Sequence, residues 1–251
     1  MKIQVKGLSK SFGAQRVLSG IDLDIPDGKV TVIIGRSGEG KSVLLKHFMG
    51  LLAPDSGEVI IGGKNIFSLD EVELNEVRKK FGMLFQNAAL FDSMSVYENL
   101  AFPLIEHSDF SEAAIRDRIM ELIGLVGLKE NVLNKFPAEL SGGMRKRVGL
   151  ARAIALKPEI LLYDEPTTGL DPVMTDVVDH LILGMQQKLG VTSVVISHDI
   201  HAVYKISDKI AMLHEGKILL EGDKKTFLET NNTVIRNFLE GRATEDQLKE
   251  L

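Results

Sequence analysis

The segment of this chain with the clearest chemical meaning is Gly35-Arg36-Ser37-Gly38-Glu39-Gly40-Lys41-Ser42. It fits the pattern G-x-x-x-x-G-K-[ST] and directly follows the apolar run 30–34, which is typical of a buried strand. Its three glycines let backbone N–H groups turn toward a triphosphate, and the helix that begins at Lys41 adds the positive end of its dipole. In such a loop the lysine reaches the β- and γ-phosphates and the Ser42 hydroxyl holds magnesium. The sequence therefore predicts a triphosphate-binding site.

A pair of acidic residues follows a second apolar run, at 160–163. Asp164 at the strand end would hold magnesium through water, and Glu165 would orient and polarise the attacking water. Adjacent residues of a strand point to opposite sides, so the two acids can serve different tasks. The alternative interpretation is a pair of solvated acids with no role in chemistry.

A third pattern, Leu140-Ser141-Gly142-Gly143, predicts the start of a helix with exposed backbone donors. Ser141 is a natural N-cap, and glycines in the first turn leave several N–H groups accessible. A capped helix alone would explain the serine but not two glycines, each of which lowers helix propensity by about 1 kcal/mol. We therefore expect a second anion receptor at this helix start.

Composition narrows the classes of protein that fit this chain. Its 251 residues, 44 % hydrophobic and 26 % charged, are enough for a full-sized core. A net charge of −5 argues against a nucleic-acid-binding protein, which usually carries a basic surface. The absence of cysteine excludes disulfides and thiolate metal sites, and it fits a reducing cytosol. We find no secretory signal and no apolar run of about 18 residues, so we expect any membrane role to depend on a partner.

Apolar runs alternate with segments of helical periodicity, and this alternation predicts an α/β fold with crossover helices. Helical patterns cover 111–128 and 143–156. The strand-like runs lie at 3–5, 21–25, 30–34, 59–61, 81–85, 160–163, 193–196, 210–213 and 218–220.

The distribution of these elements predicts one domain with an inserted lobe. Strand patterns stop between residues 87 and 157, which we interpret as a helical subdomain. The core then consists of 1–86 and 158–225. The segment 226–251 is expected to be a helical tail that packs on the body through the apolar residues Phe227, Leu228, Ile235, Phe238 and Leu239.

Four motifs in order and spacing resemble those of ABC-type ATPases, which are nucleotide-binding subunits. They are the loop at 35–42, the Ser141-Gly142-Gly143 signature, the strand end Asp164-Glu165, and His198 after the apolar run 193–196. The likeness extends from residue 1 to about 225. It implies a P-loop NTPase core of the ABC ATPase type, with a mixed sheet, N-terminal antiparallel strands and a helical subdomain, that hydrolyses ATP with Mg²⁺.

The resemblance also implies roles for individual residues. Phe12 resembles the aromatic residue that stacks on adenine, with Val17 beside it, although an ordinary core phenylalanine is the alternative. Gln86 resembles the glutamine that senses the γ-phosphate, and it would share the magnesium site with Ser42 and Asp164. Catalysis would then depend on Glu165, His198, Gln86 and Lys41. The nucleotide contacts would come from Phe12, Val17, Gly35, Arg36, Ser37, Gly38, Glu39, Gly40, Lys41, Ser42 and Val43.

In the family that this chain resembles, the signature of one subunit completes the ATP site of the other. The resemblance therefore implies a homodimer in which Ser141, Gly142 and Gly143 face the partner's nucleotide, and in which Asp171 lies on the loop that crosses to the partner. Two positions depart from the common pattern: Met144 replaces glutamine and Val43 replaces threonine. Neither change removes a phosphate donor or a magnesium ligand, so we expect activity to be retained.

Three local stretches resemble the ATPases of Mce-linked (Mla-type) phospholipid transporters. They are 38–47, 85–104 and 141–147. This resemblance implies a peripheral protein on the cytoplasmic face of the inner membrane. Its partners would be an integral membrane permease, a Mce-type substrate-binding protein and a small regulatory subunit, with no nucleic acid.

Other classes remain open at this point. A small-solute importer is the runner-up, and a soluble ABC ATPase that acts on nucleic acid, on ribosomes or in cofactor assembly is a different class. The apolar segment that follows Gln86 favours a transporter, because exposed apolar residues beside a nucleotide sensor suit the docking helix of a permease. The alternative is that these residues close the core of the helical subdomain. The residues are Ala88, Leu90, Phe91, Met94, Tyr97 and Phe102.

Two further groups of residues are expected to have no chemical role. The run Arg145-Lys146-Arg147 is interpreted as a solvated helix face. The histidines other than His198 are interpreted as surface or packing residues; they are His47, His107, His180, His201 and His214.

Overall fold

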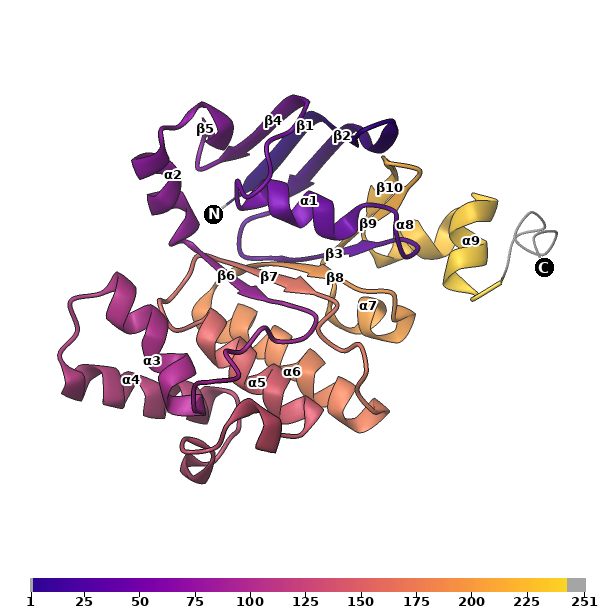
Figure 1. Ribbon diagram of the computed structural model, residues 1–251. Coiled ribbons are helices and arrows are strands. Elements are labelled where there is room, and N and C mark those ends of the chain that lie inside the picture. The colour runs from indigo at the N-terminus through magenta and orange to yellow at the C-terminus, as the bar shows by residue number, and fades with distance from the viewer. Residues whose placement is uncertain (1, 243–251) are drawn as a thin grey trace.

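The computed structural model describes residues 2–242 and contains two β-sheets with helices on both sides of the larger one (Figure 1). The smaller sheet is antiparallel, with strand order β2-β1-β4-β5. It is built from β1 (Ile3–Phe12), β2 (Gln15–Ile25), β4 (Ser56–Ile61) and β5 (Lys64–Asn65). It confirms the expected N-terminal antiparallel strands.

The larger sheet has the order β10-β9-β3-β8-β7-β6, and all neighbours are parallel except the edge strand β10. Every residue of the central strands β3 and β8 is buried, as expected for parallel strands covered on both faces. The strands are β3 (Val30–Ile34), β6 (Phe81–Leu84), β7 (Ile160–Asp164), β8 (Thr192–Ile196), β9 (Lys209–His214) and β10 (Lys217–Gly222).

The two faces of this sheet pack into separate cores. In β3, Val32 and Ile34 belong to a core shared with the long helices, whereas Ile33 belongs to a core shared with helix α1 and the antiparallel sheet. This alternation follows from the two-residue period of a strand. Helix α1 (Lys41–Phe48) lies between the two sheets and contributes Leu44 to the second core (Figure 1).

Helices alone occupy the connection between β6 and β7. They are α3 (Val96–His107), α4 (Glu112–Leu125) and α5 (Gly142–Ala153), with short 3₁₀ turns at Glu130–Val132 and Pro137–Glu139. The remaining helices are η1 (Ile66–Ser68), α2 (Glu71–Arg78), α6 (Pro172–Leu189), α7 (Ile200–Ile206), α8 (Lys224–Glu229) and α9 (Thr233–Leu239). The proposed boundaries of the subdomain, at 87 and 157, stay a prediction.

Helix α3 covers part of the apolar segment that follows Gln86, outside the helical patterns at 111–128 and 143–156. The side chain of Ser95 accepts a hydrogen bond from the Glu98 N–H (3.2 Å), and the Glu98 carboxylate accepts one from the Ser95 N–H (2.7 Å). This reciprocal pair is a capping box, and it starts the helix at Val96. The pattern S-x-x-E was present in the sequence, and reading it would have predicted the helix.

Up to residue 242 the C-terminal segment packs on the body through part of the expected apolar stripe. Phe227 in α8 and Ile235 in α9 are buried, and Phe238 packs against the same core, whereas Leu228 is exposed. The part of the expected tail at 243–251 lies outside the described residues.

Candidate functional site

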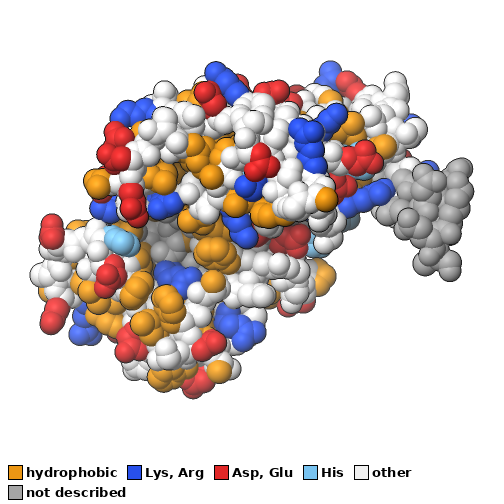
Figure 2. Space-filling model, turned by 45° about the horizontal axis from the view of Figure 1, so that its top comes forward, with side chains coloured by type: hydrophobic (Ala, Val, Ile, Leu, Met, Phe, Trp, Pro, Cys, Tyr) orange, Lys and Arg blue, Asp and Glu red, His pale blue; other side chains and the backbone are white. Residues whose placement is uncertain are grey.

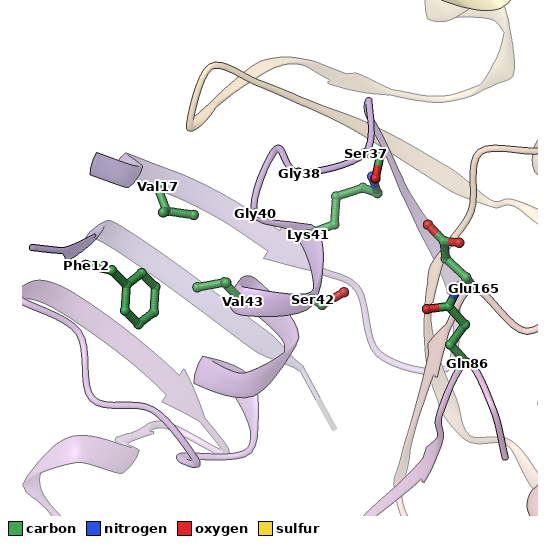
Figure 3. Close-up of a pocket in the computed structure, with 10 residues that line it drawn as sticks. All are labelled: Phe12, Val17, Ser37, Gly38, Gly40, Lys41, Ser42, Val43, Gln86 and Glu165. Atoms are coloured by element: carbon green, nitrogen blue, oxygen red, sulfur yellow. The ribbon is translucent and has the colours of Figure 1, made fainter. Parts of the chain in front are cut away.

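The loop between β3 and α1 borders a pocket of about 360 Å³. Figure 3 shows Lys41 and Ser42 on one side of this pocket, with Gln86 and Glu165 opposite them at the ends of β6 and β7. Ten of the described residues line it: Phe12, Val17, Ser37, Gly38, Gly40, Lys41, Ser42, Val43, Gln86 and Glu165. The structure thus brings together in one cavity most of the residues that the sequence assigned to nucleotide binding.

Glycine is required at two positions of the loop by close approach of neighbouring atoms. At Gly35, with φ of 152°, a Cβ atom would lie 2.4 Å from the carbonyl oxygen of Leu213. At Gly40, with φ of 97°, it would lie 2.7 Å from Val17 Cγ1. Both positions adopt backbone conformations that side chains disfavour, so the loop can close over a ligand only with glycine there.

Lys41 turns its ammonium back onto its own loop. The Nζ atom donates hydrogen bonds to the carbonyls of Gly35 (2.8 Å) and Arg36 (2.7 Å). Burial lowers the pKa of Lys41, and the nearby carboxylates of Glu165, Glu39 and Asp164 oppose that shift. The ammonium is therefore held over the concave side of the loop by two bonds that a phosphate oxygen could replace.

The side chain of Glu39 does not face this pocket. Its carboxylate accepts hydrogen bonds from His214 Nδ1 (3.0 Å) and from the Glu215 backbone N–H, in the hairpin between β9 and β10. His214, which we expected to be a surface or packing residue, instead anchors the loop through Glu39.

Oxygen donors suited to a magnesium ion come from both sides of the pocket. Ser42 Oγ donates a hydrogen bond to Asp164 Oδ1 (3.0 Å), and Gln86 lines the same cavity. Burial raises the pKa of Asp164, although the bond from Ser42 opposes this. A hydroxyl, a carboxylate and an amide oxygen form the hard donor set that magnesium prefers, so these residues fit the metal that the sequence predicted.

Glu165 is held in an unusual backbone conformation, with φ of 48°. Its N–H donates to the carbonyl of Ile196 (3.1 Å), and its Oε2 accepts a hydrogen bond from Thr168 Oγ1 (2.9 Å). The same oxygen lies 3.5 Å from His198 Nδ1. Non-glycine residues with positive φ are often found at functional sites, and here the conformation directs the carboxylate into the pocket (Figure 3).

The aromatic ring of Phe12 is exposed at the outer end of the pocket, so the alternative of a core phenylalanine is wrong. The ammonium of Lys10 lies 5.7 Å from the centre of the ring, and Val17 and Val43 flank the same cavity. A ring with one free face, beside a loop that can bind phosphates, is able to stack on a purine base.

The signature residues lie apart from this pocket within one chain. Ser141 caps α5 by accepting a hydrogen bond from the Met144 N–H (3.3 Å). Gly142 borders a different pocket of about 400 Å³ that also touches Gln86, and Asp171 caps α6 by accepting from Val173 and Met174 N–H groups.

Close approach of backbone does not require glycine at either signature position. At Gly143 a Cβ atom would lie 2.4 Å from Cε, the flexible end of the Met174 side chain in α6, which can move aside. At Gly142 the nearest atom, Leu170 Cδ2, would lie at an ordinary 3.6 Å. The expectation that both glycines serve a bound anion stays a prediction.

Two residues near the pocket were missed or misread in the sequence. Thr168 donates a hydrogen bond to Glu165 and was not predicted as a site residue, although it lies only three residues further along the chain. Lys146 is buried on α5, which corrects the expectation of a solvated face for 145–147. Its ammonium bonds to the backbone carbonyls of Gln86 and Glu165, a contact between elements that no local pattern could indicate.

The apolar segment that follows Gln86 divides into a buried part and an exposed part. Ala88 is buried, and Leu90 and Tyr97 pack against the core. Phe91 and Phe102 are exposed, with ring centres 5.2 Å apart in an edge-to-face arrangement. Figure 2 shows hydrophobic side chains gathered on the surface of the lobe that contains α3 and α4.

Comparison with known proteins identifies the family. The family model described as ABC transporter matches residues 18–168, more than half of the chain. The probable ribonucleotide transport ATP-binding protein mkl of Mycobacterium leprae is 46 % identical over 96 % of this chain and 69 % of its own length. The intermembrane phospholipid transport system ATP-binding protein MlaF of Haemophilus influenzae is 39 % identical over 99 % of this chain and 97 % of its own length.

A solved structure agrees with these sequence matches. It is a dimeric ATP-binding cassette in a post-hydrolysis state with ADP and phosphate bound, 32 % identical, and it superimposes with a TM-score of 0.81 over 88 % of this chain and 98 % of that one. Among the residues described here, 2–242, no helix is long and apolar enough to cross a bilayer. The chain therefore belongs to the ATP-binding, ATP-hydrolysing subunits of ABC transporters.

Proposed function

We propose that this chain powers the movement of phospholipid through a separate membrane permease, as one of two identical ATP-hydrolysing subunits. The observation that carries the ATPase part is the pocket in which Lys41, Ser42, Gln86 and Glu165 converge. The lipid part is supported by the relative named for phospholipid transport, which aligns with nearly the whole chain.

Each side of the pocket has a distinct task in this proposal. The ring of Phe12 stacks on adenine, and the glycines of the loop present their N–H groups to the phosphates. Lys41 exchanges its two carbonyl contacts for the β- and γ-phosphates. Ser42, Gln86 and Asp164 hold magnesium, which when bound neutralises the charge of the phosphates. The backbone donors and the lysine act already in the ground state, so they mainly determine affinity.

Glu165 performs the step that breaks ATP. Its carboxylate orients and polarises a water molecule for attack on the γ-phosphate, and His198, whose Nδ1 lies 3.5 Å from that carboxylate, contacts the same phosphate. The bond from Thr168 fixes one carboxylate oxygen and leaves the other free to accept from water. The proton of the attacking water passes to the carboxylate or to the phosphate oxygens.

The site is completed by a second copy of the chain. The start of α5 lies beside a separate pocket in its own subunit, so its free N–H groups need a phosphate from elsewhere. A head-to-tail dimer would place Ser141 and Gly142 of one subunit against the γ-phosphate of the other. The dimeric state of the structurally similar cassette supports this arrangement.

The exposed rings on the helical lobe form the surface that docks the permease. Phe91 and Phe102 lie on the connection that begins at Gln86, so a change at the γ-phosphate can reach them. Aromatic residues are favoured at the centres of interfaces. In this proposal the chain lies on the cytoplasmic face of the membrane, with a Mce-type substrate-binding protein and a small regulatory subunit as further partners.

A second candidate, transport of a small solute, is favoured by a specific observation. The relative at 46 % identity is named for ribonucleotide transport. The two candidates separate in one assay: the complex of this chain with its co-purified permease is reconstituted, and its ATPase rate is measured with phospholipid and with ribonucleotides. Stimulation by ribonucleotides and not by lipid would replace the first candidate with the second.

The substitution Glu165→Gln tests the catalytic part. The amide keeps the shape of the side chain but loses the charge that polarises water, so kcat should fall by about 10²–10⁴-fold with ATP affinity retained. The variant should accumulate as an ATP-bound dimer on gel filtration. Undiminished turnover would refute the role of Glu165.

A further inference from the structure

Lys146 is a buried lysine whose ammonium connects three parts of the site. It lies in the second turn of α5 and is 6 % exposed. Its Nζ donates hydrogen bonds to the backbone carbonyls of Gln86 and of Glu165, the latter at 3.3 Å. These two residues follow β6 and β7, which are adjacent parallel strands. The Lys146 side chain thus connects helix α5 to the starts of the two loops that follow β6 and β7.

The burial of this ammonium requires compensation. Lysine is rarely buried without a partner, and in the described part of the chain Lys146 has no ion pair. Burial lowers its pKa, while the carboxylates of Glu165 and Asp164 oppose the shift from a distance. The compensation therefore comes from charged hydrogen bonds to carbonyls, which are stronger than neutral ones.

The two carbonyls lie in or close to backbone with a disfavoured conformation. Glu165 has φ of 48°, and Ala88 and Ala89, which follow Gln86, have φ of 61° and 49°. Arg152, two turns further along α5, donates to the carbonyls of both alanines, at 3.1 and 2.8 Å. Helix α5 therefore stabilises this disfavoured backbone through two side chains, Arg152 and Lys146. Of the two, Lys146 is the one that contacts Glu165.

We propose that Lys146 is a positioning residue that aligns Gln86 and Glu165 with each other and ties both to helix α5. The inference rests on the proposed function, because it gives those residues their roles at the γ-phosphate. In this proposal Lys146 also connects the two ATP sites of the dimer. The N-terminus of α5 receives the partner's nucleotide, and one turn later Lys146 holds the residues that act on the subunit's own nucleotide.

The test compares Lys146→Met with Lys146→Arg and with Lys129→Met in the full chain. Methionine removes the ammonium at nearly constant volume, arginine restores donors, and Lys129 is an exposed lysine of the same lobe. Misplacing a catalytic group by about 1 Å costs on the order of 100-fold, so Lys146→Met should lower kcat by about tenfold to 100-fold. The Kd for ATP and the melting temperature should hardly change, Lys146→Arg should recover most of the loss, and Lys129→Met should behave as the unmutated chain.

The outcomes separate this inference from the proposed function. If the Glu165→Gln variant forms an ATP-bound dimer but Lys146→Met, made in the chain that keeps Glu165, retains full kcat, the positioning role is wrong and the proposed function stands. A parallel fall in ATP affinity and kcat would also overturn the inference, since it would indicate a merely structural lysine. If Lys146→Met does not fold, Lys146→Gln, with a shorter donor, replaces it and must show the same split. Failure of the Glu165→Gln dimer would instead remove the proposed function.

Discussion

Lys41 in the phosphate loop and Lys146 in helix α5 are alike in burial and unlike in what they hold. Each is 6 % exposed and each donates to two backbone carbonyls. The partners of Lys41, Gly35 and Arg36, are six and five residues away in its own loop. Those of Lys146 are 60 and 19 residues away, in two other connections.

This difference separates binding from positioning. A lysine bonded within its own loop can transfer its ammonium to a ligand without moving any other element. A lysine bonded across elements cannot do so without releasing both of them. The phosphate-loop side of the site should therefore determine nucleotide affinity, and the α5 side should determine the geometry of the chemical step.

The substitution Lys41→Ala should affect mainly the binding side and should give the largest loss of ATP affinity. It removes charged hydrogen bonds to ground-state phosphates, each worth about 1.5–3 kcal/mol, so ATP affinity should fall by at least about tenfold. Titration of the purified chain with a fluorescent ATP analogue measures this. An unchanged Kd together with a reduced kcat would give Lys41 the behaviour expected of Lys146 and break the comparison.

The substitution Phe91→Asp probes the outer surface of the helical side. Phe91 is 43 % exposed, so a charge there should shift the melting temperature by no more than about 2 °C. Binding to the membrane permease should be lost, because the charge lies in the proposed docking surface. The measurement is a pull-down from the membrane fraction, beside thermal melting and ATP binding.

Leu228→Asp is the matched control, since Leu228 is an exposed apolar residue on α8. It should leave membrane association intact. A collapsed melting temperature for Phe91→Asp, or equal loss of association in both variants, would contradict the docking surface.

The substitution Asp179→Asn lies outside both regions and should change stability alone. Asp179 on α6 is 3 % exposed, and its Oδ1 has no hydrogen-bond partner among residues 2–242. Burial raises its pKa to about 6, with Lys205 opposing the shift and Asp199 and Asp176 adding to it. An acid with a raised folded-state pKa contributes stability that is lost as pH rises from about 4 to about 6. The neutral amide should therefore stabilise the chain by about 2 kcal/mol above pH 7 and by little at pH 4.

Thermal melting of the variant across this pH range measures the effect, with Asp176→Asn as a control. Asp176 is exposed and bonded to Lys205, which lowers its pKa, so its amide should bring no gain at high pH. Equal stabilisation at both ends of the range would show that Asp179 is already neutral at pH 7, contrary to the expectation. Neither variant should alter kcat, which makes the pair a baseline for the effects at the site.

The parts of the fold that depend on local pattern were predictable. The alternating runs and the glycine loop placed β3, α1 and β7 close to their observed bounds. The spacing of buried residues along an element, and the residue types that a turn requires, are both visible within a few positions of the sequence. Helix α3 lies outside the helical patterns identified in the sequence, because its Ser95 capping box was overlooked.

The parts of the site that depend on long-range contacts were not predictable. The bond of His214 to Glu39 spans 175 residues, and that of Lys146 to Gln86 spans 60. Neither has a signature in local spacing. Contact across helices also places the end of the Met174 side chain beside Gly143, which its motif could not indicate.

The shared site is the central claim, and mixing two inactive variants tests it most directly. Lys41→Ala damages the phosphate loop, and Ser141→Arg fills the α5 start, so neither alone should form a stable ATP-bound dimer. Both are made in the Glu165→Gln background, mixed with ATP, and analysed by gel filtration for dimers and retained nucleotide. A mixed dimer combines the intact loop of one chain with the intact α5 of the other, so we predict dimers that retain one ATP each. A mixture that behaves as the sum of the two separate variants would contradict a site built from two subunits.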